Sequence, residues 1–185
     1  SFLQTLDNID KDHIGAVGIC GSGVYVPNGL RNDNRVKAIA SIAPFIMMTD
    51  IKTNTDENLM KMKADYEKGG EVQRLDLIKD SEGEAYYRNP DRGAAVQACP
   101  TPVWSQLAWH QFHPTETVRE LKVPYLVIAG EKAFTTEGAK KMFENAPNPK
   151  YFHLTLGATH FEMYDMEKYV KENVNELLTF FGKHL

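Results

Sequence analysis

Three side chains that could share one catalytic step, Cys20, Glu131 and His160, each follow an apolar run of this sequence. A thiol, a carboxylate and an imidazole in this chain order can serve as nucleophile, acid and base. The imidazole would take a proton from the nucleophile, and the carboxylate would orient the imidazole. A cysteine thiol needs less activation than a hydroxyl, because a small fraction of it is already ionised near neutral pH.

Cys20 lies in a glycine-rich turn that suits a nucleophile, Gly18-Ile19-Cys20-Gly21-Ser22. Small residues are needed around such a nucleophile because its backbone is strained and the next helix packs close to the strand. Gly21, which follows it, would donate its backbone N–H to an oxyanion. Ser22 is a competing nucleophile, but we expect it past the turn, in the first helical turn, where serine can act as a cap.

Four short apolar runs predict the strands that bring these side chains together. Short, nearly continuous apolar runs are typical of parallel strands that are buried on both faces. The carboxyl ends of parallel strands share one edge of the sheet, where ligands bind. Because the runs alternate with helical segments, the fold class is α/β, with a mostly parallel sheet flanked by helices. The predicted strands cover residues 13–19, 35–43, 123–130 and 151–156.

Apolar spacing and capping residues predict the helices. Residues 1–12 have the spacing of the end of an amphipathic helix. Residues 24–33 carry mixed signals, since Pro27 would damage a helix interior. Thr135 or Thr136 is expected to cap the helix that begins there. The other predicted helices cover residues 56–68, 104–112, 135–145 and 166–182.

Residues 45–115 differ from the rest in being rich in Met, Lys, Glu and aromatic residues, and they predict a lid-like or irregular insertion between strands. Within this block, residues 81–103 contain three prolines and are expected to form loop and short turns. The methionines of the block favour packing over a substrate pocket. The functional alternative is that this insertion forms a lid over the cleft in which the substrate would bind.

Three stretches, IGAVGICGSGVYV, VPYLVIAGEKA and GATHFEMYD, resemble the α/β-hydrolase superfamily, in particular its dienelactone-hydrolase-like branch with a Cys nucleophile. The resemblance covers the two ends of the chain well and the 45–115 block poorly. It implies Cys20 as nucleophile, His160 as general base and acid, and Gly21 as oxyanion donor. The implied activity is hydrolysis of an ester, lactone or related acyl bond in a small substrate. Acyl transfer and thioester hydrolysis would use the same site.

The third member of the triad departs from the family pattern. The family's acid stands three residues after the glycine that ends the strand, and that place is Ala133. Glu131 is the nearest carboxylate and the first candidate, and Asp50 is the second. Glu162 and Asp165 are further candidates close to the predicted base. Ala133 also favours a second class of function, a catalytically silent domain that binds a ligand or a partner.

The chain of 185 residues is short for the fold that it resembles, which has about 250 residues or more. We therefore expect the C-terminal part of a single α/β-hydrolase domain. In that fold the strands run in the order 1-2-4-3-5-6-7-8, and the four strands here would be the last four. The strand before Cys20 would then form an open apolar edge, which predicts pairing with an N-terminal portion or self-association.

The composition argues against some classes of binding partner and indicates the cellular compartment. The formal net charge of −4, without a clustered basic face, argues against nucleic acid, and no apolar run approaches the roughly 18 residues of a membrane span. Two cysteines are too few for a disulfide scaffold, so a reduced, cytoplasmic setting is expected, with Cys99 as a buried apolar residue. His110 and His113 lack further ligands near them, so neither a metal nor a cofactor is expected.

Overall fold

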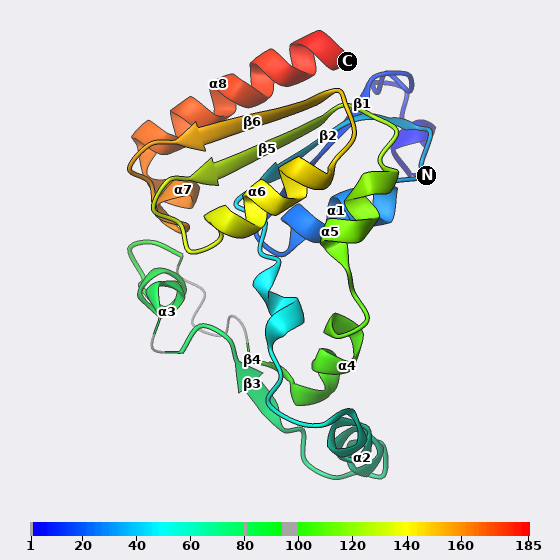
Figure 1. Ribbon diagram of the computed structural model, residues 1–185, viewed down its shortest axis with the longest axis vertical. Helices are drawn as coiled ribbons and strands as arrows, with labels where there is room; N and C mark the ends of the chain where they lie inside the picture. Colours follow the sequence, from blue (N-terminus) through cyan, green and yellow to red (C-terminus); the bar gives the residue numbers. More distant parts are fainter. Residues whose placement is uncertain (1, 80, 94–99) are drawn as a thin grey trace. The chain divides into compact units, whose positions relative to one another are not determined.

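The computed structural model describes residues 2–79, 81–93 and 100–185. Cys99, expected to be buried, therefore lies outside the described residues. The chain divides into two compact units (Figure 1). The sheet unit combines the chain up to Ile46 with Pro114–Leu185, and the inserted unit is Met47–His113.

Four strands form the parallel sheet of the sheet unit, in the order β1-β2-β5-β6. The prediction of an α/β fold is confirmed, and the order is the one expected for the last four strands. Each strand differs from its predicted range by at most two residues at either end. The strands are β1 (Ile14–Ile19), β2 (Val36–Ile42), β5 (Tyr125–Gly130) and β6 (Lys150–Thr155).

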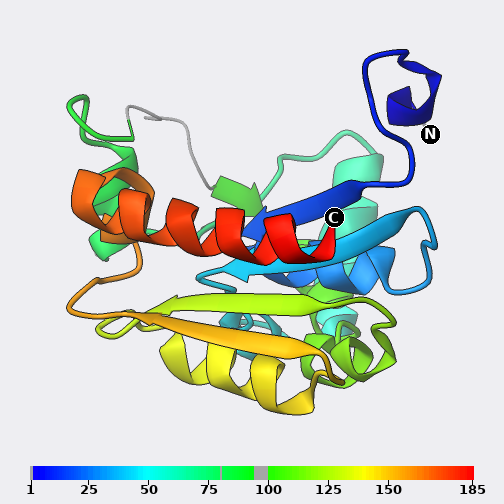
Figure 2. The ribbon, with the colours of Figure 1, turned by 90° about the horizontal axis from the view of Figure 1, so that it is seen from above.

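Helices cover both faces of this sheet (Figures 1 and 2). Helices α1 (Ser22–Leu30) and α6 (Thr136–Asn145) lie on one face, and α8 (Glu167–His184) lies on the other. Covering both faces is what allows a parallel sheet to consist of apolar strands. The shorter elements of the unit are η1 (Phe2–Thr5), α5 (Pro114–Thr117), η4 (Val118–Glu120) and α7 (Glu162–Asp165).

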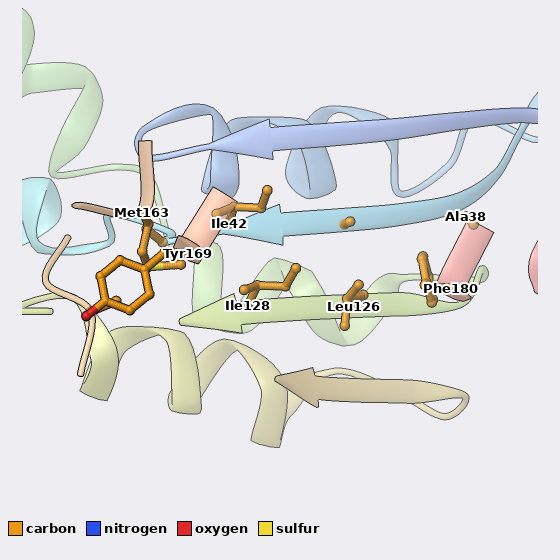
Figure 3. Packing of buried hydrophobic residues seen from close by; sticks show 10 residues of the cluster. Ala38, Ile42, Leu126, Ile128, Met163, Tyr169 and Phe180 are labelled. Atoms are coloured by element: carbon orange, nitrogen blue, oxygen red, sulfur yellow. The ribbon is translucent and has the colours of Figure 1, made fainter. Parts of the chain in front are cut away.

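The central strands β2 and β5 are buried along nearly their whole length, as their apolar sequences predict. Alternate residues of each strand point to the same face, and those facing α8 form one core cluster with it. Each fully buried Leu or Ile stabilises the fold by about 1.5–3 kcal/mol relative to an exposed one. Figure 3 labels the cluster residues Ala38, Ile42, Leu126, Ile128, Met163, Tyr169 and Phe180.

The edge strand β1 differs from its prediction as a strand buried on both faces. Val17 is 41% exposed and Ile19 is 47% exposed. Both point to the same face as Gly15, where an added Cβ would overlap the Phe181 ring of α8. The prediction was wrong for these two side chains because, among the described strands, β1 has β2 as its one neighbour.

Near the N-terminus, one prediction needs correction and one segment with mixed signals proves to be helical. Of residues 2–12, Phe2–Thr5 form the 3₁₀ turn η1 in place of the end of an amphipathic helix. No residue of this turn is buried, and Phe2 is 75% exposed, so apolar packing does not support a longer helix there. Helix α1, whose signals were mixed, runs through Pro27, and that proline is buried. A proline in a helix interior typically costs about 3 kcal/mol, so this helix must be held by other contacts.

The inserted unit contains a well-capped helix and a small antiparallel sheet. Helix α2 begins after Thr55, whose hydroxyl accepts the Asn58 N–H, and its end is followed by Gly69 at φ +96°. Gln106 is buried, and its side chain bonds both to Thr53 and to the Val103 carbonyl. The elements are η2 (Met47–Asp50), α2 (Asp56–Glu67), β3 (Arg74–Asp76), α3 (Glu82–Tyr87), β4 (Pro100–Pro102), η3 (Val103–Ser105) and α4 (Gln106–Trp109).

Helix α3 corrects the prediction of loop and turns at residues 81–103. The Ser81 hydroxyl accepts the Gly83 N–H and so caps the helix, and Arg88 at its end forms ion pairs with Glu84 and Asp76. The proline count hid this helix, because the three prolines stand beyond its end. Among the described helices of both units, none is long and apolar enough to cross a membrane.

Candidate active site

Cys20 adopts a left-handed backbone conformation, with φ of +57°, directly after β1. Its N–H donates to the Ile42 carbonyl at 3.0 Å, and its carbonyl accepts the N–H groups of Gly23 and Phe45 at 2.9 and 3.0 Å. A non-glycine residue in this region costs about 1–2 kcal/mol. These three backbone bonds hold the strained turn in place. The thiol itself is free and partly exposed.

The small residues around Cys20 have a steric reason. A Cβ on Gly18 would overlap the carbonyl of Ser22, and a Cβ on Gly23 would stand 2.9 Å from the Cα of Pro44. Helix α1 therefore starts in direct backbone contact with the strands. Ser22 is its first residue, as expected, but the N-cap position is Gly21 and no side chain caps this helix.

The Gly21 N–H belongs to the N-terminus of α1, where backbone N–H groups have no intrahelical acceptor. Such a terminus carries partial positive charge and attracts negatively charged groups. The helix therefore begins next to Cys20 with the electrostatics that an oxyanion or a thiolate needs. The sequence prediction of Gly21 as oxyanion donor is compatible with this position and stays a prediction.

His160 follows β6 and is completely buried. Its Nδ1 lies 2.9 Å from the Thr135 hydroxyl, and its Nε2 lies 2.6 Å from the Tyr164 hydroxyl. The rings of Phe134 and Phe161 pack on the imidazole, with centroids at 4.6 and 4.8 Å. Burial lowers the pKa of His160 from 6.5 to about 4, because the charged form loses its hydration. The imidazole is therefore neutral at pH 7.

The two hydroxyl partners assign a tautomer to this neutral ring. A neutral imidazole has one donor and one acceptor nitrogen. The phenol of Tyr164 is the more acidic hydroxyl, so it donates to Nε2, and the Nδ1–H donates to Thr135. This is the tautomer in which Nε2 can take a proton from a nucleophile.

Glu131 does not occupy the place predicted for it. It is exposed at the end of β5, and its Oε2 accepts the Gly157 N–H at 2.8 Å. Both ring nitrogens of His160 bond to hydroxyls, so the expected contact between a carboxylate and the ring was wrong, and the Thr135 hydroxyl lies at Nδ1 instead. Of the other candidates, Glu162 accepts the Thr159 N–H, and Asp50 ends η2 in the inserted unit.

Thr135 and Tyr164 were not predicted as site residues. Thr135 was expected to cap α6, and it does stand at the N-cap position, but its hydroxyl bonds to His160 instead of to the helix backbone. Its place two residues after Ala133, in the loop where the acid belongs, was an available signal. Tyr164 stands four residues after His160, a separation that brings side chains together on one face of a helical turn.

The structure does not join Cys20 and His160 by a hydrogen bond within the part of the chain that it describes, because both imidazole nitrogens have other partners. A series of contacts links them instead. The Phe45 N–H donates to the Cys20 carbonyl, the Phe45 ring meets Phe134 edge to face at 5.9 Å, and Phe134 packs on His160. The two residues therefore belong to one cluster at the carboxyl edge of the sheet. Over residues 2–79, 81–93 and 100–185, no group of three His, Cys, Asp or Glu side chains could hold a metal ion.

Two bacterial proteins are similar to this chain over all of its length. It is 26% identical over 212 residues to the uncharacterized protein YcjY of Escherichia coli K12, and 27% identical over 219 residues to the uncharacterized protein PA2218 of Pseudomonas aeruginosa PAO1. The chain spans 68% of YcjY and 56% of PA2218. No protein-family model matches it.

Solved structures agree with the topology. The crystal structure of PA2218 matches with a TM-score of 0.82 and 22% identity over the whole chain and 64% of PA2218. A complex of DcsB with its substrate analogue gives 0.84 and 19%, covering the whole chain and 70% of DcsB. The α/β hydrolase GrgF of Penicillium sp. sh18 gives 0.75 and 20%, over 96% of this chain and 66% of GrgF. With the order β1-β2-β5-β6 and the turn at Cys20, these matches show that the chain has the α/β-hydrolase fold.

Proposed function

We propose that this protein hydrolyses an ester, lactone or related acyl bond in a small substrate, with Cys20 as nucleophile and His160 as base. The observation that carries the proposal is the backbone of Cys20, a non-glycine residue held at φ +57° between a parallel strand and a helix N-terminus. Strain of this kind is concentrated at functional sites. Ala43 also has positive φ, at the end of β2, but it has no reactive group.

In the proposed reaction the Cys20 sulfur attacks the acyl carbon while His160 accepts the thiol proton. The Gly21 N–H stabilises the oxyanion of the tetrahedral intermediate. His160 then gives that proton to the leaving oxygen, the C–O bond breaks, and an alcohol and a thioester result. A water molecule next adds to the thioester and loses its proton to His160, and the C–S bond breaks to release the acid and the thiol.

The hydroxyl partner of His160 supports a thiol as the nucleophile. Burial lowers the pKa of His160 and so disfavours the imidazolium, and the Thr135 hydroxyl at Nδ1 carries no charge that would offset this. A serine hydroxyl needs a strong base, whereas a thiol ionises readily and tolerates a weaker one. For proton transfer, Nε2 must exchange the Tyr164 hydroxyl for the thiol. Thr135 keeps the ring in the required tautomer throughout.

Trapping of an acyl-enzyme tests the proposal. Treatment with p-nitrophenyl acetate should add one acetyl group to the protein, seen by intact mass and mapped to Cys20. Cys20→Ala should abolish the adduct, and His160→Asn should let it persist, because its hydrolysis needs the base. Cys99→Ser is the matched control and should acylate normally. Acylation that survives Cys20→Ala would rule out this nucleophile.

A catalytically silent, ligand-binding domain is the second candidate function. It is favoured by the bonding of His160, whose two nitrogens are both engaged by hydroxyls in a buried site. This candidate predicts no acyl adduct. It also predicts that iodoacetamide at pH 7 modifies Cys20 no faster than Cys99, whereas the hydrolase should show faster modification of Cys20.

The dienelactone-hydrolase-like assignment and a cytoplasmic setting remain part of this proposal, as does a lid role for the inserted unit. The open edge of β1, with Val17 and Ile19 exposed, supports the proposed pairing with another strand, from an N-terminal portion or from a second copy.

A further inference from the structure

The carbonyl of Gly23 lacks its usual partner inside helix α1. In an α-helix this carbonyl would accept the N–H of the residue four positions later. That residue is Pro27, which has no N–H. Gly23 is buried, so solvent does not replace the lost bond. An unsatisfied buried carbonyl in the first turn after Cys20 would loosen the part of the helix that packs on the strands.

Strand β2 supplies the missing donor. The Ser41 hydroxyl donates to the Gly23 carbonyl at 2.6 Å, and Ser41 is completely buried. Ser41 in turn accepts the hydroxyl of Tyr125, at the start of β5, at 2.8 Å. Tyr125 is also completely buried, and burial raises the pKa of its phenol, so it stays a neutral donor. We call Tyr125, Ser41 and the Gly23 carbonyl the hydroxyl relay.

The hydroxyl relay ends at Gly23, a residue that also bonds to the backbone of Cys20. The Gly23 N–H donates to the Cys20 carbonyl, so the peptide groups on the two sides of Gly23 bond to Cys20 and to Ser41. Ser41 also pairs with Gly18 across the β1–β2 ladder. The relay therefore joins three strands to the first turn of α1, where Gly21 presents its N–H.

We infer that Ser41 and Tyr125 are positioning residues that fix the first turn of α1, and through it Cys20 and the Gly21 N–H, for catalysis. This inference rests on the proposed function, since it assigns the relay to the same site. It explains how α1 can contain Pro27 without loss of the turn. Neither residue touches the reacting atoms.

The test reads Cys20 directly, by its alkylation rate with iodoacetamide at pH 7, mapped by peptide mass with Cys99 as internal reference. Ser41→Ala should lower the alkylation rate of Cys20 by about two- to fivefold, the effect on a nearby thiolate that is expected of a well-placed helix N-terminus. With p-nitrophenyl acetate, kcat should fall about 10- to 100-fold at little-changed KM. Tyr125→Phe should have a smaller effect, because Ser41 still reaches Gly23. Tyr151→Phe is the matched control. It removes a tyrosine hydroxyl from β6, the strand next to β5, and that hydroxyl bonds to His184 of α8 and not to the relay.

A rescue separates positioning from general destabilisation. In Pro27→Ala the new N–H can donate to the Gly23 carbonyl. Adding Ser41→Ala to that variant should therefore change the alkylation rate of Cys20 by less than about twofold, which is less than a helix N-terminus contributes. Urea unfolding measured alongside shows whether stability alone has changed. Equal slowing of Cys20 alkylation by Ser41→Ala with and without Pro27→Ala would overturn the inference. So would an unchanged alkylation rate in a Ser41→Ala protein that is less stable.

If Ser41→Ala alone does not fold, the double variant with Pro27→Ala decides. A folded and reactive double variant supports the inference, and an unfolded one refutes it. Alkylation does not need turnover, so an inactive protein with a responsive Cys20 would reject the proposed function and keep the relay.

Discussion

Acidification should weaken this fold through His160, between pH 6.5 and about 4. Burial lowers the pKa of the imidazole to about 4 in the folded protein, against 6.5 when it is solvated. Below pH 6.5 the unfolded chain binds a proton here that the folded chain does not. The stabilisation is therefore fully present above pH 6.5 and is lost as the pH falls to about 4.

The expected loss is about 3 kcal/mol, from about 1.4 kcal/mol for each pH unit between the two pKa values. This is a large share of the 5–15 kcal/mol that typically separates folded from unfolded proteins. Carboxylates add further losses toward the acid end of this range and below it; the bonds with Arg35, for example, lower the pKa of Asp33 to about 2. The contribution of His160 must therefore be measured as a difference between variants.

Urea unfolding of the protein and of His160→Asn at pH 7, 6, 5 and 4 provides this difference. His160→Asn should be less stable at pH 7, and the gap in free energy of unfolding should shrink by about 3 kcal/mol by pH 4. His13→Asn is the control: His13 forms an exposed pair with Asp10, so the gap between this variant and the unchanged protein should vary much less with pH.

Nuclear magnetic resonance of the ring nitrogens checks the same point without unfolding. The His160 signals should stay those of a neutral ring until about pH 4, with the proton on Nδ1. If His160 is the base of the free enzyme, kcat/KM should show an acid limb at the same pH. A ring that titrates near pH 6.5, or a stability gap that does not change with pH, would refute the buried, uncharged assignment of His160.

Three further predictions concern the neighbouring structure. Gly18→Ala should destabilise the protein by at least about 2 kcal/mol in urea unfolding, because its Cβ would overlap helix backbone. Gly29→Ala, where a Cβ meets open space, should instead stabilise it by about 0.5–1 kcal/mol, and a similar loss in both would contradict the steric argument. Thr135→Asp should raise the pKa of His160 above about 4 in a ring titration, since a carboxylate would then face Nδ1; an unchanged value would show that residue 135 does not face the ring. Residues 1–185 alone should be oligomeric on size exclusion, and Val17→Lys on the β1 edge should shift them toward monomer; a stable monomer without the substitution would contradict the open edge.

The sheet and the turn at Cys20 follow from the amino-acid sequence alone. Continuous apolar runs separated by helical segments leave few arrangements other than a parallel sheet covered on both faces. The steric demand for small residues around a strained turn is equally local, so Gly18 indicates the turn from the sequence alone. Both signals depend on residues that are neighbours along the chain, and the order of the amino acids fixes those neighbours.

The hydrogen-bond partners of the polar side chains depend instead on how distant parts of the chain come together. Glu131 and Thr135 lie in the same loop, and which of them reaches His160 depends on the path of the backbone to within about 3 Å, the range of a hydrogen bond. Pro27 left the helix signals of residues 24–33 mixed because its missing donor is visible in the sequence, whereas the compensating hydroxyl comes from Ser41 on strand β2. Exposure of β1 likewise depends on which strands lie beside it, a property of the sheet as a whole and not of the apolar run.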